Sequence, residues 1–330
     1  MSLRDRLIRL LADGQFHSGN DMARALGVSR SAIWKQIHQL NTLGLAIETA
    51  SRRGYRLSSS LDLLDASTIT NALDPQAREA SDGVEVLFVT SSTNTMLASR
   101  EAPAAGRWRA VFAEYQTDGR GRRGRRWISP FGTGLCFSLS WLFSRAPRDL
   151  PALSLAAGLA VIRPLEATGA QELALKWPND ILIAGDKLGG VLVDVDGDAR
   201  GPLRVVIGIG INLSAPQALV RTVTAEGGLS PGALDGAPGK APLERSRLAA
   251  EMIGSLYRAL ERFQRDGFAP LADDWRRRDY LFGKPVVVRS GTDEKCGIGC
   301  GIAPDGALLI ERPEGIAAVF NGEVTVRVRE

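Results

Sequence analysis

An alternation of strand-like and helix-like segments between about residues 68 and 275 does most to limit the folds open to this 330-residue chain. Long helical segments occur singly and do not follow every strand. This pattern predicts an α/β domain with a mixed sheet of about six or seven strands, rather than a doubly wound parallel sheet. The expected strands are 84–89, 110–115, 134–141, 173–177, 180–185, 188–195 and 203–213, and the expected helices are 92–101, 151–169 and 243–267.

The first sixty residues predict a separate winged helix-turn-helix. Apolar side chains recur at helical spacing in three stretches, and the short turn LGVS at 26–29 separates the second from the third. Such a turn lets the last helix enter the major groove of DNA. Residues 45–58, LAIETASRRGYRLS, then alternate like the two strands of a wing. The side chains expected to contact DNA are Arg30, Ser31, Trp34, Lys35, Arg52 and Arg53.

The charge distribution favours a nucleic-acid partner for this N-terminal part. Residues 1–60 carry nine Lys or Arg against four Asp or Glu, whereas the other 270 residues carry 32 against 33. The basic excess of the chain therefore lies in its first sixty residues, as expected for a unit that binds nucleic acid. A solvated surface or a protein-interaction module would show the same excess, so these alternatives stay open.

From about residue 276 the chain consists of short apolar runs separated by the turn sequences SGTD, PDG and NG. These runs predict a small β-barrel of about fifty residues at the C-terminal end. The serine-rich stretch 58–67 is interpreted as a linker followed by a new start. The expected domains are therefore 1–62, 63–275 and 276–330.

The composition, with 44% hydrophobic and 24% charged residues, is that of an ordinary soluble globular protein. The N-terminal residues carry charges at helical spacing instead of the apolar core of a signal peptide, and no run of about 18 apolar residues is found. We expect a cytoplasmic protein without a membrane partner.

Cys136, Cys296 and Cys300 are interpreted as strand residues, without a disulfide or a structural metal, although the last two have the spacing of half a metal site.

Five of the seven residues Arg120–Arg126 are arginine, and two glycines separate them. Glycine lets a backbone approach an anion, and guanidinium groups donate forked hydrogen bonds to phosphates and carboxylates. Similar runs occur in disordered RNA-binding tracts, but the position directly after a strand favours an anion-binding loop. Common nucleotide motifs are incomplete: GIGINL at 208–213 lacks the third glycine of a Rossmann fingerprint and no helix signal follows it closely, and no P-loop sequence occurs.

Two further segments are candidates for the same pocket. SSTNT at 91–95 follows a strand and opens a helix, where backbone N–H groups are free to bind a small polar ligand. KWPND at 176–180 ends a strand, and Lys187 follows it closely. A helix cap and a hairpin are the structural alternatives for these segments.

Five segments together resemble the biotin protein ligases in their order and approximate spacing. With the winged helix in front, essentially the whole chain resembles the bifunctional form, which is also the biotin operon repressor. The resemblance implies an α+β multidomain fold, with a central domain like that of class II aminoacyl-tRNA synthetases and an SH3-like C-terminal barrel. The segments are STN at 92–94, QTDGRGRRGRRW at 116–127, KWPNDI at 176–181, KLGGVLVD at 187–194 and GIGINL at 208–213.

The resemblance implies that the carboxylate of biotin attacks the α-phosphate of ATP, in the presence of Mg²⁺, to give biotinyl-5′-AMP. This adenylate would acylate a lysine of a biotin carboxyl carrier protein and would also act as corepressor, so that a ligand-bound homodimer binds operator DNA. The alternatives are a ligase whose winged helix no longer regulates and a ligand-sensing transcription factor without ligase activity. Lipoate ligases share the fold but lack the GRGRRGR run.

Roles for single residues also follow from the resemblance. Ser92, Thr93 and Asn94 would hold the ureido ring of biotin, with Gln116 near its carboxylate tail. Arg120, Gly121 and Arg122 would fold over the bound acid, and Lys187 would contact the activated carboxyl group and phosphate. Asp180 would assist the incoming lysine or position the metal. The implied catalytic set is Lys187, Arg120, Arg122, Asp180 and Lys176, and the implied ATP-binding set is Arg122, Lys176, Asn179 and Asn212.

Two positions depart from the family pattern. Ser91 stands where the family commonly has an acid directly before STN. From Leu213 to Pro242 there is no Phe, Tyr or Trp, although the bifunctional members usually offer an aromatic residue over the adenine there. We therefore expect the adenine to pack on aliphatic side chains such as Leu219, Val220 or Val223, with a weaker coupling of ligand to dimerisation.

Overall fold

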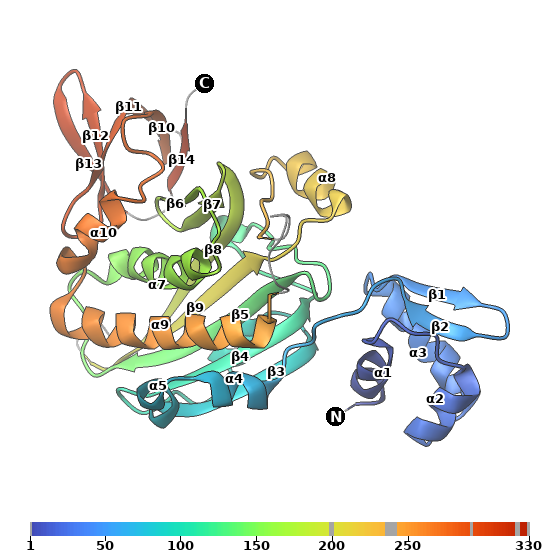
Figure 1. The fold of residues 1–330 in the computed structure, drawn as a ribbon. Coiled ribbons are helices and arrows are strands. Elements are labelled where there is room, and N and C mark those ends of the chain that lie inside the picture. The colour runs from blue at the N-terminus through green and yellow to red at the C-terminus, as the bar shows by residue number, and fades with distance from the viewer. Residues whose placement is uncertain (1, 198–200, 235–242, 291–292, 321–323, 329–330) are drawn as a thin grey trace.

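The computed structural model describes residues 2–197, 201–234, 243–290, 293–320 and 324–328. Figure 1 shows three units along the chain: a small N-terminal unit to one side, a large central sheet with helices on it, and a C-terminal sheet above one end of the central unit. The order of these units is the order predicted from the sequence.

The N-terminal unit contains the three predicted helices and the two-stranded wing. Ser18 and Ser29 cap the second and third helices by accepting backbone N–H bonds, and Gly27 ends the second helix with a φ of 68°. The apolar faces form one core with Phe88 and Phe131 of the central unit, so the two units are packed together. The elements are α1 (Leu3–Leu11), α2 (Gly19–Leu26), α3 (Arg30–Thr42), β1 (Ile47–Ala50) and β2 (Gly54–Leu57).

The central unit is built on a seven-stranded sheet with the order β3-β4-β5-β9-β8-β7-β6. Its first pair of strands is parallel and all its other pairs are antiparallel, which confirms the predicted mixed sheet. The strands are β3 (Ser81–Thr90), β4 (Trp108–Gln116), β5 (Gly134–Phe143), β6 (Leu173–Lys176), β7 (Asp180–Ile183), β8 (Asp186–Gly197) and β9 (Leu203–Asn212).

Helices α7 (Leu153–Ala167) and α9 (Arg245–Asp266) cover one face of this sheet, as Figure 1 shows, and the short α6 (Thr93–Ala98) packs on the other. Successive strand residues point to opposite faces, so Phe112 joins the core below α7 and α9 whereas Val111 packs against α6. The stretch Leu150–Ala167 is long and apolar enough to cross a membrane, but 72% of it is buried inside the molecule, as in a core helix.

Several short helices were missed by the sequence analysis. The expectation that no helix closely follows GIGINL was wrong, because α8 begins at Gln217 and is anchored by the buried side chain of Leu219. One of the missed helices, α10, also crosses the predicted domain boundary between residues 275 and 276. The missed elements are α4 (Ala66–Ala72), α5 (Pro75–Glu79), α8 (Gln217–Ala225), α10 (Ala272–Arg276) and the 3-10 turns η1 (Arg122–Gly124), η2 (Leu150–Ala152) and η3 (Ala269–Leu271).

The C-terminal strands form a five-stranded antiparallel sheet with the order β13-β12-β11-β10-β14. Its buried side chains belong to the same core as the central sheet, and the indole of Trp177 donates a hydrogen bond to the carbonyl of Gly306 at 3.0 Å. The C-terminal sheet is therefore fixed next to the KWPND segment. The strands are β10 (Pro285–Ser290), β11 (Asp293–Ile302), β12 (Leu308–Arg312), β13 (Gly315–Val319) and β14 (Val324–Val328).

The stretch interpreted as a linker is held at its middle by contacts with a buried ion pair. The Arg245 guanidinium lies 2.9 Å from a carboxylate oxygen of Glu114, and the two side chains are only 5% and 1% exposed. Glu114 also accepts the backbone N–H of Leu64 at 2.6 Å, and Asp62 accepts the backbone N–H of Arg245 at 2.9 Å. We call Asp62, Leu64, Glu114 and Arg245 the interdomain clamp, because they fix the linker to β4 and to the start of α9.

Candidate active site

Residues 92–94, the N-cap and first two residues of α6, form a fixed polar pocket after the end of β3. Ser92, Thr93 and Asn94 are all buried there. The side-chain oxygen of Gln116, at the end of β4, accepts the backbone N–H of Thr93 at 2.7 Å. Ser138 on β5 donates to the Asn94 side-chain oxygen at 2.5 Å. These side chains therefore present amide and hydroxyl groups in set directions, as recognition of a small polar ring requires.

Two glycines of GIGINL are explained by packing around this pocket rather than by a nucleotide loop. A Cβ atom on Gly208 would lie 2.1 Å from the side-chain oxygen of Asn94, and one on Gly210 would lie 2.4 Å from the ring of Trp127. Both contacts are shorter than real side chains allow. The glycines of β9 thus let Asn94 and Trp127 approach the sheet from the cavity side.

The arginine loop, residues Arg120–Arg126, closes on itself between β4 and β5. The backbone N–H of Gly121 donates to the carbonyl of Arg125 at 2.7 Å, and that of Trp127 donates to Gly119 at 2.8 Å. Among its side chains, Arg122 is partly buried, and this burial lowers the pKa of its guanidinium against the opposing effect of Asp180. The loop therefore brings at least one guanidinium into the cavity instead of leaving all of them in solvent.

Lys176, Asp180 and Lys187 form a charged cluster where β6, β7 and β8 meet. The ammonium of Lys187 lies 2.6 Å from a carboxylate oxygen of Asp180. Lys176 is 6% exposed, and its burial lowers the pKa of its ammonium; Asp180 opposes this shift, while Lys187 and Arg327 add to it. One carboxylate thus faces several cations, so the cluster has an excess of positive charge with which to receive anions.

The remaining walls come from the segments that follow β9 and from the C-terminal sheet. Asn212 is buried, and its side-chain amide donates to the backbone carbonyls of Lys187 and Gly232 at 3.3 and 3.2 Å. Leu219 and Val223 of α8 line the cavity, whereas Val220, the third aliphatic side chain expected near the adenine, is not among its lining residues. The cavity has a volume of about 800 Å³, which is enough for a drug-sized ligand.

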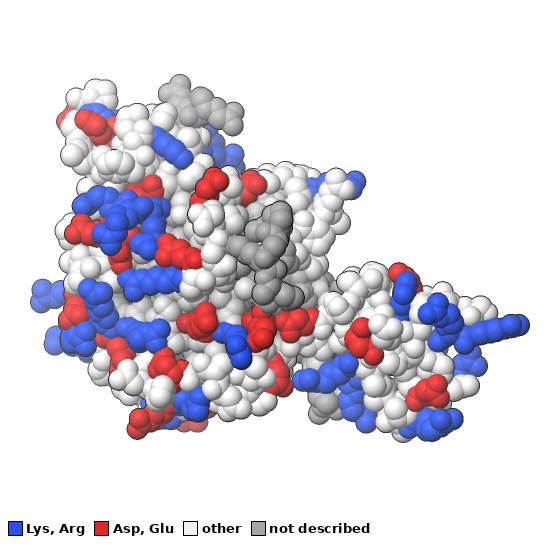
Figure 2. All heavy atoms as spheres, viewed as in Figure 1, with Lys and Arg blue, Asp and Glu red and all other residues white. Residues whose placement is uncertain are grey.

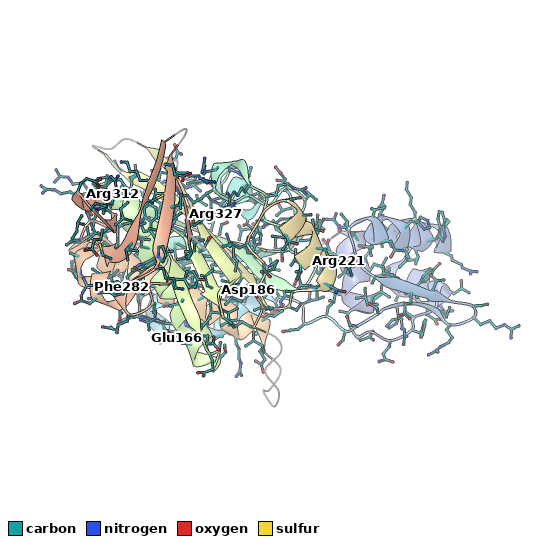
Figure 3. The ribbon with its side chains drawn as sticks, turned by 90° about the horizontal axis from the view of Figure 1, so that it is seen from above. Glu166, Asp186, Arg221, Phe282, Arg312 and Arg327 are labelled. Carbon is teal, nitrogen blue, oxygen red and sulfur yellow. The ribbon has the colours of Figure 1, made fainter. Side chains whose placement is uncertain are left out.

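Every ligase-site residue predicted from the sequence lies on the wall of this one cavity. The predicted residues are Ser92, Thr93, Asn94, Gln116, Arg120, Gly121, Arg122, Lys176, Asn179, Asp180, Lys187 and Asn212. The prediction missed other wall residues, including Trp127, Tyr280 and Arg327. In the view from above, Arg327 and Asp186 lie between Phe282, just ahead of β10, and Arg221 of α8 (Figure 3). Nothing in the short runs of the C-terminal sheet indicated a contribution to the cavity.

The predicted DNA-contacting residues lie apart from this cavity, on the N-terminal unit. Arg30, Ser31, Trp34 and Lys35 are exposed on α3, and basic side chains project from the wing in Figure 2. Two predicted DNA-contacting side chains make aromatic contacts on this surface. Trp34 packs against His38 with ring centroids 4.5 Å apart, and the Arg53 guanidinium lies 4.0 Å from the centre of the Phe16 ring.

Comparisons with known proteins agree with a division into an N-terminal helix-turn-helix unit and a larger unit that carries the cavity. Residues 86–212 match the model of the biotin/lipoate A/B protein ligase family, and residues 3–56 match that of a helix-turn-helix domain. The chain is 38% identical to the bifunctional ligase/repressor BirA of Salmonella typhimurium, over 98% of this chain and 97% of that one. It is 36% identical to the biotin–[acetyl-CoA-carboxylase] ligase of Paracoccus denitrificans, over 72% of this chain and 98% of that one.

A solved structure shows the same fold in the ligase part. The biotin protein ligase from Aquifex aeolicus in complex with biotin and ATP has a TM-score of 0.62 and 26% identity, and the match covers 75% of this chain and 100% of that chain. The fold and the cavity therefore define a protein ligase of the biotin/lipoate class. Because the likeness continues through the helix-turn-helix, the chain belongs to the bifunctional ligase/repressor family.

Proposed function

We propose that this chain is a cytoplasmic biotin–[acetyl-CoA-carboxylase] ligase that activates biotin with ATP and transfers it to a lysine of a biotin carboxyl carrier protein. The observation that carries the proposal is the single cavity that joins the polar pocket at 92–94 to the charged cluster around Asp180. A small acid held in the pocket would have its carboxylate among cations, next to a wall suited to a nucleotide.

The first chemical step brings two anions together. A carboxylate oxygen of biotin bonds to the α-phosphorus of ATP, and pyrophosphate leaves with the electron pair of the broken P–O bond. Arg120, Arg122 and Lys187 would reduce the repulsion between the reactants and stabilise charge that develops at phosphorus. Buried Lys176 would add to this field with a side chain that is already desolvated.

Mg²⁺ is expected to accompany ATP, and the residues fit a metal held mainly by the phosphates. In the part of the chain that the structure describes, Asp180 is the one carboxylate on the cavity wall. Mg²⁺ commonly uses one or two carboxylates together with substrate phosphates. When bound, it would supply further charge neutralisation at the triphosphate.

In the second step, the amine of the acceptor lysine attacks the acyl carbon of biotinyl-5′-AMP, and AMP leaves. The attacking nitrogen must give up protons, and an acceptor close to the acyl carbon assists this loss. We assign this role to Asp180; the assignment is supported by its ion pair with Lys187, the residue proposed to contact the activated carboxyl group.

A labelling assay tests the ligase. The protein is incubated with ATP, Mg²⁺, biotin and a biotin carboxyl carrier domain, and biotinylated lysine is detected. We expect Lys187→Ala to slow adenylate formation roughly a hundredfold, or about 3 kcal/mol, as for a lost transition-state donor. Lys295→Ala, at an exposed site on β11, is the control and should be unchanged. The absence of label, where a known ligase labels the same carrier, would refute the function.

We also propose that the N-terminal unit represses transcription by binding operator DNA as a ligand-dependent dimer. The supporting observation is the exposed basic and aromatic surface of α3. One recognition helix reads one half-site, so specific binding needs two copies on a palindrome. The strand β3 is an edge of the central sheet with one strand partner in the described part of the chain, so it is a candidate for edge-to-edge contact between two copies.

Gel shifts on the promoter of the organism's own biotin-biosynthesis genes test the repressor, together with sedimentation of the free protein. Both operator affinity and dimerisation should increase on addition of biotin plus ATP, because a ligand that favours the dimer also favours DNA binding by linkage. Lys187→Ala, which forms the adenylate slowly, should lose most of this response. If neither measurement responds to ligand in the wild-type protein, the regulatory proposal fails and the ligase proposal stands alone.

A further inference from the structure

Asp194, near the end of β8, connects the pocket at 92–94 to the arginine loop. Its Oδ2 accepts a hydrogen bond from Nδ2 of Asn94 at 3.0 Å and lies 3.4 Å from Nη1 of Arg120. Asn94 is 3% exposed, whereas the side chains of Asp194 and Arg120 are 36% and 49% exposed. One carboxylate oxygen therefore accepts a hydrogen bond from a buried amide and also pairs with an exposed guanidinium.

On the buried side, Asp194 decides which way the Asn94 amide points. Ser138 donates to the oxygen of this amide, and Asp194 accepts from its nitrogen. A flipped amide could still donate to the Ser138 hydroxyl, but it would lose the hydrogen bond to Asp194 and turn its oxygen toward a carboxylate, which only accepts. Without an acceptor at position 194, the buried N–H would lack this partner, which is costly for a group away from water.

On the solvent side, the charge of Asp194 competes with the ligand for Arg120. The proposed ligand is an acid, and its carboxylate needs the same guanidinium that Asp194 holds. The negative charge of Asp194 also offsets part of the positive charge that Arg120 offers to an anion. Because both side chains are well exposed, this effect is small, as it is for other solvent-exposed ion pairs.

We propose that Asp194 is a positioning residue whose two functions act on ligand affinity in opposite directions. As a hydrogen-bond acceptor it orients Asn94 and strengthens recognition of the polar ring. As a negative charge it restrains Arg120 and weakens binding of the carboxylate. This inference rests on the proposed binding of biotin in the cavity.

Two substitutions separate the functions. Asp194→Asn keeps an acceptor oxygen for Asn94 but removes the charge, whereas Asp194→Ala removes both. Biotin and its neutral alcohol analogue, biotinol, are titrated into the full-length protein by calorimetry. Asp196→Asn is the matched control, because Asp196 is an exposed acid two residues further along the same strand.

We expect Asp194→Asn to tighten biotin binding about two- to fivefold and to leave biotinol binding unchanged, because the effect requires a ligand charge. Asp194→Ala should weaken both ligands about tenfold or more, because both need an oriented Asn94. The inference is overturned if the two variants shift biotin affinity in the same direction, if either behaves like Asp196→Asn, or if Asp194→Asn affects both ligands equally. Failure of the wild-type protein to bind biotin would instead refute the proposed function.

Discussion

Asp279 combines a buried carboxylate with few compensating contacts. Its Oδ1 accepts the backbone N–H of Leu281 at 2.9 Å, but its Oδ2 has no hydrogen-bond partner. Burial raises the pKa of this carboxyl group from 3.8 to about 6, against the opposing effects of that hydrogen bond and of Lys284. The folded state thus binds this proton more tightly than the unfolded state does. The stabilisation that Asp279 gives below pH 4 is therefore lost as the pH rises from about 4 to 6.

We expect Asp279→Asn to remove this pH dependence and to stabilise the protein at pH 7.5. The gain is at most about 3 kcal/mol, since one pKa unit corresponds to about 1.4 kcal/mol. Urea midpoints of variant and wild type are compared between pH 4 and pH 7.5. Asp305→Asn is the control, because exposed Asp305 also accepts the N–H two residues ahead, from Ala307. A difference between variant and wild type that stays constant with pH would contradict the assignment.

Site residues that lie in short polar motifs could be predicted from the sequence. Site residues that lie outside these motifs, on strands brought to the cavity by the fold, could not. STN, the arginine loop and KWPND each place several polar groups within a few positions, which is unusual in a strand-rich domain. Asp194 and Arg327 instead occur as ordinary polar positions of strands. Only the pairing of β8 with β9, and the placement of the C-terminal sheet, bring them to the site, and a single sequence specifies neither in advance.

We expect the arginine loop to control how long the adenylate stays bound. The half-buried Arg122 should be the arginine that closes over the product of the first step. Arg122→Gly should therefore speed escape of biotinyl-5′-AMP roughly tenfold or more, with stray labelling of lysines on other proteins, as for loss of a charged hydrogen bond. The rate of adenylate dissociation is the measurement, and an unchanged rate would remove Arg122 from this role.

Arg123→Gly is the matched control for that experiment. It removes the same charge from the same loop, but Arg123 is more exposed and has a φ of 58°, a value that glycine adopts without strain. If the effect came only from greater loop flexibility, both variants would release the adenylate at the same increased rate. A specific role of Arg122 predicts that Arg123→Gly stays close to the wild-type rate.

Long segments could be predicted from the sequence more readily than short ones. The apolar runs of the central sheet and the long α7 and α9 have patterns that persist over many residues. Helices such as α5 and α8 are too short to be stable alone, and α8 is rich in Thr and Val, which are weak helix formers. Their stability comes from packing, through Ala77 and Leu219, and this information is absent from local sequence.

In the whole molecule, the interdomain clamp connects the N-terminal unit to the strands that carry the site. Glu114 lies on β4, which ends at Gln116. Arg245 also donates to the carbonyl of Gly134, which pairs with Asn212 across β5 and β9. We therefore expect the linker to move together with the cavity walls. The orientation of α3 relative to a second copy would then depend on the clamp.

Arg245→Met should test this connection. Removing one partner leaves Glu114 as an unpaired buried charge, so we expect a loss of about 3–5 kcal/mol in unfolding free energy. Faster proteolysis at residues 58–65 and weaker operator binding should accompany it, although α3 is untouched. Adding Glu114→Gln should restore part of the stability, because the uncompensated charge is gone. Arg247→Met is the control, since its partner Glu244 is 65% exposed and the pair contributes little. If Arg245→Met loses stability but keeps wild-type proteolysis and operator affinity, the clamp stabilises the fold without orienting the N-terminal unit.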